Sequence, residues 1–248
     1  LSGVKSFWVG QFETTEEVEP NSDFKEPQSI SLNSTIEGIL ENEDIDYYLV
    51  EAKKGQRISA EVEGIRLGNS FYDPYLAIMN MDRFELSASD DTALLLQDST
   101  TSIVAPEDGK YVILIRESSY TGNGSCRYRL HVGSFPRPIA VYPAGGQKGT
   151  NLKVNLIGDP MGESELTVQL PDSGISEHKI FSQSDDLLSP SPNKIRVSNY
   201  PNAMEVEPND NRAQSTIVKT PLPVALNGII NKDGDHDWFK FTAKKGQR

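Results

Sequence analysis

The sequence predicts an all-β protein built from β-sandwich modules, and three observations support this prediction. Short apolar or alternating stretches recur between turn residues, with little helical periodicity. The run Tyr111–Ile115 is almost continuously apolar, which is typical of a central sandwich strand. A long block of sequence returns 188 positions downstream, which indicates a repeated module.

The first module is expected to contain at least seven strands, which is enough for a β-sandwich. Arg127–Val132 alternates strictly between polar and apolar residues, so this strand is expected to have one wet face. The expected strands are Thr35–Leu40, Asp46–Ala52, Arg57–Glu63, Tyr75–Met79, Thr101–Val104, Tyr111–Glu117 and Cys126–Val132.

A second, smaller module is expected over residues 134–204. Pro136 and Pro138 form a stiff hinge at its start, because proline fixes φ and restricts the preceding residue. Leu152–Leu156 and Leu166–Leu170 alternate as strands, whereas Ser182–Asn193 is rich in Ser, Asp and Pro and is expected to be a long loop. The pattern predicts a small Ig-like sandwich.

The repeat defines the remaining boundaries. Glu17–Asn21 returns as Glu205–Asn209, and Ala52–Arg57 returns unchanged as Ala243–Arg248. Between these blocks Gly38 matches Gly228, and Tyr47-Tyr48 match Trp238-Phe239; upstream, Phe7, Val9 and Phe12 match Ile195, Val197 and Tyr200. We therefore expect residues 1–16 to end a preceding Ig-like module, 17–133 to form the first sandwich, and 205–248 to be a truncated second copy with unpaired sheet edges.

Composition limits the partners. The chain carries 36 acidic and 24 basic side chains, a formal net charge of -12, which opposes nucleic acids and anionic membranes and favours cations. No apolar run is long enough to span a bilayer, so no membrane insertion is expected. The single cysteine, Cys126, provides no disulfide framework. The chain lacks an initiator Met and a signal-peptide pattern, so we expect it to be part of a longer polypeptide with flanking domains.

Residues 17–133 resemble the bacterial pre-peptidase C-terminal domain. The resemblance is carried by Glu17–Asn21, Gly38, Asp44–Tyr48, Lys54–Gln56, Asp73–Leu76, Asp90-Asp91, Ala105–Tyr111 and Tyr128–Val132. It implies a secreted, jelly-roll-like sandwich without catalytic residues, of a kind that binds substrate and carries calcium near its start in secreted collagenases. Residues 205–248 resemble the first third of the same domain. The intervening module is similar to IPT/TIG-type Ig-like domains at Pro143, Gly145-Gly146, Gly149 and Gly158.

Two acidic groups are candidates for a Ca²⁺ site. Glu17 and Glu19 lie two apart on an extended segment and therefore point the same way, and Asp44 and Asp46 repeat that spacing before a strand. If the segment folds back, these acids and the Asn21 amide converge into a set of hard oxygens that suits Ca²⁺. The alternative is a solvated acidic linker and turn. The second copy offers the matching set Glu205, Glu207, Asn209, Asp235 and Asp237.

Catalytic motifs are not found. His131, His178 and His236 form no zinc-binding pattern, and His131 is interpreted as a surface residue of a strand. No nucleophile elbow or phosphate-binding loop is present, and Cys126 is interpreted as a structural thiol. Asp73, Asp90, Asp91 and Asp98 are interpreted as turn caps, with a second metal site as the alternative. Phe71, Tyr72 and Tyr120 lie in expected loops, where exposed rings could contact a ligand.

The sequence therefore predicts a non-enzymatic, extracellular protein, either secreted or at the cell surface, that binds a protein or polysaccharide polymer or acts as a spacer. The alternative is an accessory targeting region of a secreted peptidase whose catalytic domain lies elsewhere in the polypeptide.

Overall fold

The computed structural model describes residues 9–68 and 70–247, and the described chain is all-β, as predicted. Its helical segments are two short 3₁₀ turns, η1 (Ile65–Leu67) and η2 (Ala93–Leu95). No helix in these ranges is long and apolar enough to cross a membrane. The expected preceding module lies partly outside the described residues, and Phe7 and Arg248 of the repeat lie wholly outside them.

The chain divides into two compact units. Unit 1 runs to Arg137 and also includes Gly158–Gly162 and Phe181–Ser191. Unit 2 contains Pro138–Ile157, Glu163–Ile180 and the segment from Pro192 onward.

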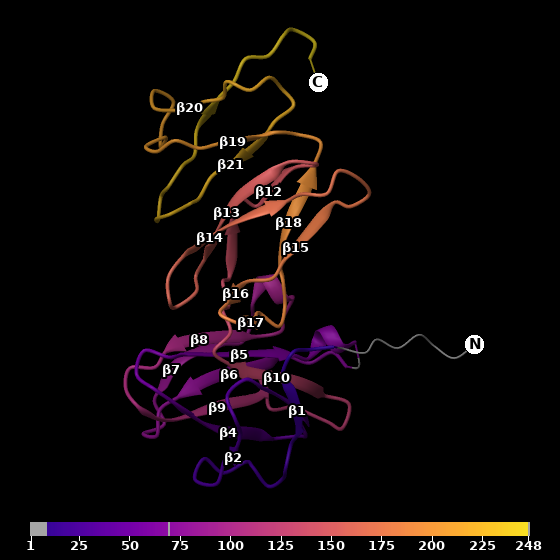
Figure 1. Cartoon of the computed structure of the whole chain (residues 1–248), viewed down its shortest axis with the longest axis vertical. Helices are drawn as coiled ribbons and strands as arrows, with labels where there is room; N and C mark the ends of the chain where they lie inside the picture. Colours follow the sequence, from indigo (N-terminus) through magenta and orange to yellow (C-terminus); the bar gives the residue numbers. More distant parts are fainter. Residues whose placement is uncertain (1–8, 69, 248) are drawn as a thin grey trace, which may run out of the picture. The chain divides into compact units, whose positions relative to one another are not determined.

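Two five-stranded sheets form unit 1 (Figure 1). The first has the order β1 (Glu13–Glu16), β3 (Ser34–Ile39), β10 (Arg127–Gly133), β5 (Arg57–Glu63), β8 (Thr100–Val104). The second has the order β2 (Gln28–Ser29), β4 (Ile45–Ala52), β9 (Gly109–Glu117), β6 (Pro74–Met79), β7 (Glu85–Ser89). The edge pairs β1–β3 and β2–β4 are parallel, and the other neighbours are antiparallel.

One hydrophobic core receives side chains from both sheets. Ile36 and Leu130 from the first sheet and Val50 and Ile113 from the second belong to the same buried cluster. The nearly continuous apolar run is the middle strand β9, whose alternate residues Val112 and Leu114 face a second buried cluster. β9 is thus buried on both faces, which explains why its sequence does not alternate.

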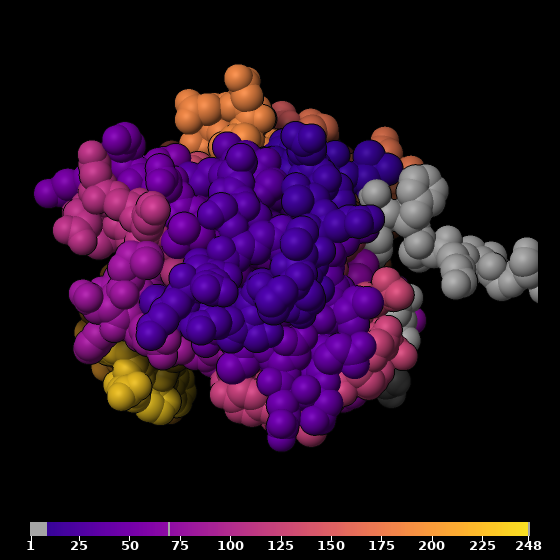
Figure 2. Space-filling model, turned by 90° about the horizontal axis from the view of Figure 1, so that it is seen from below, coloured from indigo at the N-terminus to yellow at the C-terminus, as the bar shows by residue number. Residues whose placement is uncertain are grey.

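All seven expected strands of the first module are present, with ends that differ by at most two residues. β1, β2 and β7 were not expected; they are short or exposed edge strands, and their sequences carry little apolar signal. N-terminal segments of unit 1, drawn in indigo, cover much of the face seen in Figure 2.

The prediction that β10 has a solvent-exposed face is wrong. Arg129 and His131 are both buried, because residues 9–12 and the loop 181–191 cover this side of the sheet. His131 is accordingly not a surface residue, and its Nδ1 lies 2.8 Å from Thr35 Oγ1. The expected loop 182–193 also contains a short hairpin, β16 (Gln183–Ser184) with β17 (Leu187–Leu188), and belongs to unit 1 as far as Ser191.

Unit 2 contains two three-stranded sheets that share a smaller core around Val154, Val168 and Ile195. The sheets have the orders β11 (Ala140–Tyr142), β13 (Asn151–Ile157), β14 (Ser164–Gln169) and β12 (Gly145–Gln147), β18 (Asn193–Ser198), β15 (Glu177–Ile180).

The rest of unit 2 contains the second copy of the repeat. Two parallel strand pairs occur here: β19 (Asn202–Met204), just before the copy, pairs with β21 (Ala225–Asn227), and β20 (Thr216–Ile217) pairs with β22 (Phe239–Lys240). Trp238, Phe241 and Ile230 are exposed in this segment.

A buried ion network lies on the outer face of β5. Arg137 Nε is 2.7 Å from Glu61 Oε2, and neither side chain is exposed. Glu61 also contacts Arg66 and the Ser191 hydroxyl, while Arg137 Nη1 donates to the Ser191 carbonyl at 3.0 Å. The network attaches the loop 181–191 to the sheet, because buried charges are stable only when each has a partner.

We expect Arg137→Ala to lower the free energy of unfolding by about 3 kcal/mol, because breaking a buried ion pair leaves Glu61 short of one partner. Urea denaturation measures this loss. Lys53→Ala is the control: its ion pair with Asp108 is exposed, so the expected loss is below about 1 kcal/mol. Equal, small losses in the two variants would contradict a stabilising network.

Candidate functional site

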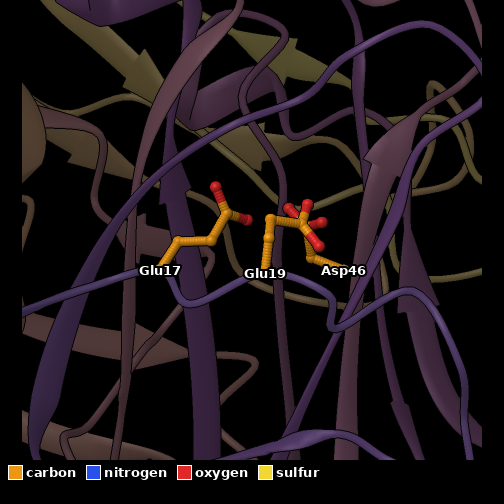
Figure 3. A group of neighbouring side chains, drawn as sticks. All are labelled: Glu17, Glu19 and Asp46. Carbon is orange, nitrogen blue, oxygen red and sulfur yellow. The ribbon is translucent and has the colours of Figure 1, made fainter.

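Three predicted ligands meet at the edge between the two sheets of unit 1. Glu17, Glu19 and Asp46 each offer a carboxylate oxygen, and these oxygens lie within 4.8 Å of one another (Figure 3). Glu17 directly follows β1, and Asp46 is the second residue of β4.

The backbone of segment 17–21 bridges the two sheets. Glu17 N donates to Glu37 O on β3 at 3.0 Å, and Tyr47 N on β4 donates to Asn21 O at 3.1 Å. Two further bonds orient the glutamates: Ile39 N donates to Glu17 Oε2 at 3.0 Å, and Asn21 N donates to Glu19 Oε2 at 2.9 Å. The acids therefore converge because their backbone is fixed at both ends.

Two tyrosine hydroxyls contact the acids at the buried end of the site. Tyr128 on β10 contacts Asp46 Oδ2 at 2.6 Å and Glu17 Oε1 at 2.9 Å, and it also contacts the Tyr48 hydroxyl. Tyr48 OH lies 3.2 Å from Glu17 Oε1. Burial raises the pKa of both tyrosines, so each keeps its single proton. Tyr48 can donate to Glu17 Oε1 and Tyr128 to Asp46 Oδ2, so the two hydroxyls can serve one oxygen of each acid.

Two side-chain oxygens at the buried end of the site lack a hydrogen-bond partner among the described residues. Asp46 is fully buried and Asn21 almost so, yet Oδ1 of each has no hydrogen-bond partner among the described residues. Burial, followed by the nearby Glu17 carboxylate, raises the pKa of Asp46 to about 10. Without a cation, Asp46 is thus protonated at neutral pH.

The remaining predicted acid of the first copy lies apart. Asp44 Oδ1 accepts from the Ser22 hydroxyl at 3.1 Å, and Asp44 Oδ2 accepts from Glu41 N at 3.2 Å. These bonds close the turn before β4. Asp44 is therefore not in the three-acid group.

The second copy builds the same arrangement. Glu205, Glu207 and Asp237 offer carboxylate oxygens within 4.8 Å of one another. Asn209 is fully buried, and its Oδ1 is without a partner in the described chain.

The supporting hydrogen bonds are repeated as well. Ile229 N donates to Glu205 Oε1 at 2.7 Å, Asn209 N donates to Glu207 Oε2 at 2.9 Å, and Trp238 N donates to Asn209 O at 3.0 Å. The segment that carries the acids is thus held by the same backbone bonds in both copies.

Asp235 corresponds to Asp44 and also lies outside its cluster. Its Oδ2 accepts from Asn231 N at 2.8 Å, and this hydrogen bond lowers the pKa of Asp235. In both copies the first aspartate (Asp44 or Asp235) accepts hydrogen bonds in the turn, and the second (Asp46 or Asp237) lies with the glutamates.

The two copies differ in their phenols. Phe239 stands where the first copy has Tyr48, so it offers no hydroxyl. Glu205 Oε2 and Asp237 Oδ1 are buried there without partners among the described residues. Burial raises the pKa of Glu205, and the Asp237 carboxylate contributes in the same direction.

Sequence reasoning found the acids but missed the residues beneath them. Gly38 matches Gly228 in the repeat, and the structure gives the reason: a Cβ at Gly38 would meet the Tyr128 ring and, at 2.9 Å, Glu17 Oε2. A Cβ at Gly228 would meet Glu205 Oε2 at 2.6 Å and the Asp237 carboxylate. The repeated glycine was the available signal for the floor of the site.

The other candidates have structural roles. Asp98 is buried and accepts from the backbone N–H groups of Gly64 and Ile65 at 3.0 and 2.7 Å, as expected of a turn cap. Cys126 is buried. The expectation of an exposed Tyr72 is wrong, because its ring lies in the core and its hydroxyl donates to Arg127 O at 2.7 Å. Phe71 is exposed.

Comparison with known proteins gives structural likenesses only. No family model matches the chain, and no curated protein matches it. The pre-peptidase C-terminal domain of a collagenase from Bacillus anthracis is 17% identical, with 43% of this chain and 94% of that chain covered and a TM-score of 0.34. The lysozyme inhibitor PliG of Aeromonas hydrophila (14% identity, 43% and 95% covered) and the copper-binding surface protein CorA of Methylomicrobium album BG8 (8% identity, 43% and 98% covered) each give a TM-score of 0.31.

In the presence of a chelator, we expect stability to fall as pH rises. The pKa of Asp46 is raised to about 10 in the folded chain, whereas the unfolded value is near 3.8, so the folded state binds the extra proton between these limits. The free energy of unfolding should decrease by up to about 1.4 kcal/mol per pH unit, the limit for one proton. Urea titrations between pH 5 and pH 8 test this range.

Asp46→Asn mimics the protonated acid and should flatten this pH dependence. Asp44→Asn, two residues away on the same segment, should leave the slope unchanged. An identical slope in wild type and Asp46→Asn would contradict a buried, protonated Asp46.

Gly38→Ala should disturb the site through steric overlap, because the new Cβ would clash with Tyr128 and Glu17. We expect a loss of about 1–3 kcal/mol of unfolding free energy, the usual cost of overpacking. Gly109→Ala is the matched control, since a Cβ there meets nothing within 4 Å. Thermal denaturation compares the two variants; equal midpoints would show that the floor of the site tolerates a methyl group.

Proposed function

We propose that this chain is a non-catalytic binding or spacer region of a larger secreted protein and that each copy of the repeat holds one Ca²⁺ ion at its carboxylate cluster. One observation carries the proposal: buried oxygens without hydrogen-bond partners lie beside converging carboxylates, and this occurs twice on the same backbone arrangement.

The residues fit a calcium ion by charge and by ligand type. Glu17, Glu19, Asp46 and the Asn21 amide supply only oxygen ligands, which hard cations prefer. Ca²⁺ takes six to eight oxygens, so water or backbone carbonyls would provide the rest. Magnesium demands stricter octahedral geometry and usually keeps several waters, so a site rich in carboxylates favours calcium.

A bound cation would neutralise the negative charge of the Glu17, Glu19 and Asp46 carboxylates. Asp46 could then be ionised without an unpartnered negative charge in a buried position. Because segment 17–21 contacts β3 at one end and β4 at the other, the ion would also strengthen the connection between the two sheets. Calcium would thus act on stability and on the orientation of the N-terminal segment.

The finer fold assignment is part of the same proposal. The two five-stranded sheets with a shared core support a jelly-roll-like sandwich in unit 1, and the paired three-stranded sheets support an Ig-like module in unit 2. The resemblance to the pre-peptidase C-terminal domain supports tandem copies separated by that module.

The proposed location is extracellular, on a secreted or surface-attached protein. Extracellular calcium modules bind at about 10⁻⁴–10⁻³ M, an affinity that partly exposed carboxylates can provide. The net charge of -12 favours cationic over anionic ligands. We assign the chain a protein or polysaccharide polymer as partner and no catalytic step.

Calorimetric titration of the chelator-treated chain with CaCl₂ tests the calcium sites. We expect two equivalents to bind and the denaturation midpoint to rise, with a gain of about 2.7 kcal/mol when calcium is 100-fold above its Kd. Glu17→Gln should remove one equivalent, and Glu205→Gln should remove the other.

Asp44→Asn and Asp235→Asn are the matched controls, because the structure places both outside the three-acid groups. Both should retain two equivalents. Absence of heat and of any change in the midpoint on adding calcium would refute the proposal, and loss of binding in Asp44→Asn would refute the ligand assignment.

A further inference from the structure

A separate cavity lies in unit 1, on the outer face of the first sheet. It has a volume of about 150 Å³. Arg129, His131 and Glu63 form its polar floor, and the walls come from Phe12 and from the loop 181–191. Neither acidic cluster contributes to its lining.

The floor offers hydrogen-bonding groups that the protein does not use fully. Arg129 Nη1 donates to Glu63 Oε2 at 2.9 Å and Arg129 Nε to Glu37 Oε1 at 3.3 Å, but Nη2 has no acceptor in the described part of the chain. His131 Nε2 lies 3.3 Å from Glu63 Oε2 and is buried without an aligned partner there. A donor and an acceptor therefore lie side by side at the base of the cavity.

The walls are apolar, and their position is fixed. Phe12 stacks at 5.7 Å from Phe135, and Phe181, Leu188 and Pro190 line the other side. The Gln11 side chain holds the hairpin in place: its Nε2 donates to Leu188 O at 2.8 Å, and its Oε1 accepts from Leu188 N at 3.2 Å. The cavity is thus a preformed space and not a gap between unconnected loops.

Charge and size restrict the ligand. A carboxylate would face Glu63, and an ammonium group would face Arg129, so the ligand is neutral. A cavity of this volume holds a single benzene-sized ring. A pyranose of similar size would place most of its hydroxyls against apolar walls without partners.

We propose that this cavity binds a neutral phenol, with the ring between Phe12 and the Phe181–Pro190 wall and the hydroxyl at Arg129 and Glu63. A phenolic hydroxyl both accepts and donates hydrogen bonds. It can therefore accept one from the free Arg129 N–H and donate one to Glu63. Val9 and Phe181 are exposed, so the cavity can be reached from solvent. The phenol comes either from a free compound or from a tyrosine side chain of a polypeptide.

Titration of the ¹⁵N-labelled full chain with phenol tests the proposal through the amide resonances of Gln11 and Leu188. We expect saturable shifts with a Kd of about 1 mM, as for small ligands of this size. Benzene, benzoate and benzylamine should each bind at least 10-fold more weakly. Titration with N-acetyltyrosinamide identifies the source: comparable binding indicates a tyrosine side chain, and its absence beside phenol binding indicates a free phenol.

Gly10→Leu should block the cavity, because a Cβ at this position lies 3.8 Å from Arg129 Nη2 and the backbone there needs no positive φ. The expected result is at least a 10-fold loss of phenol affinity. Gly109→Leu, where the added side chain meets open space, should bind phenol like wild type. Unsaturable shifts, equal binding of benzoate, or unchanged binding in Gly10→Leu would overturn the proposal.

Discussion

The structure of the acidic site depends on one constraint: segment 17–21 must cross from one sheet to the other while carrying its carboxylates. The bonds from Glu17 N to Glu37 O and from Tyr47 N to Asn21 O fix the segment at both ends. With the backbone fixed in this way, the side chains of Glu17 and Glu19 point toward Asp46. A folded chain accepts such a concentration of negative charge only if protons, hydrogen bonds or a cation compensate it.

Much of the fold could be predicted because it depends on local pattern. The alternating apolar residues of β5, the apolar run of β9 and the turn residues between strands predicted the strands of the first module, because these signals lie within each strand's own sequence. The outer face of β10 could not be predicted in this way. Its polar residues Arg129 and His131 are covered by a loop more than 50 residues downstream, and no local pattern records that contact.

The acidic site shows the same limit. The repeat identified Glu17, Glu19 and Asp46, because acids at matching places in two copies indicate a shared role. It could not separate Asp44 from Asp46, because both recur in the second copy, and only the structure shows that Asp44 lies before β4 and accepts hydrogen bonds within the turn. Tyr128 was also missed as part of the site. It lies 82 positions from Asp46 in sequence, and only the pairing of β10 with β3 brings its hydroxyl to the acids.

Comparison of the two copies distinguishes the residues that bring the carboxylates together from those that change how their charge is compensated. Both have the repeated glycine, the two glutamates, the second aspartate and the buried asparagine, held by equivalent backbone bonds. The second copy has Phe239 in place of Tyr48 and still gathers its three acids. The Tyr48 hydroxyl is therefore not needed to bring the carboxylates together. Convergence depends on the bridging segment and the strand it meets, and Tyr48 of the first copy changes how the charge of the acids is compensated.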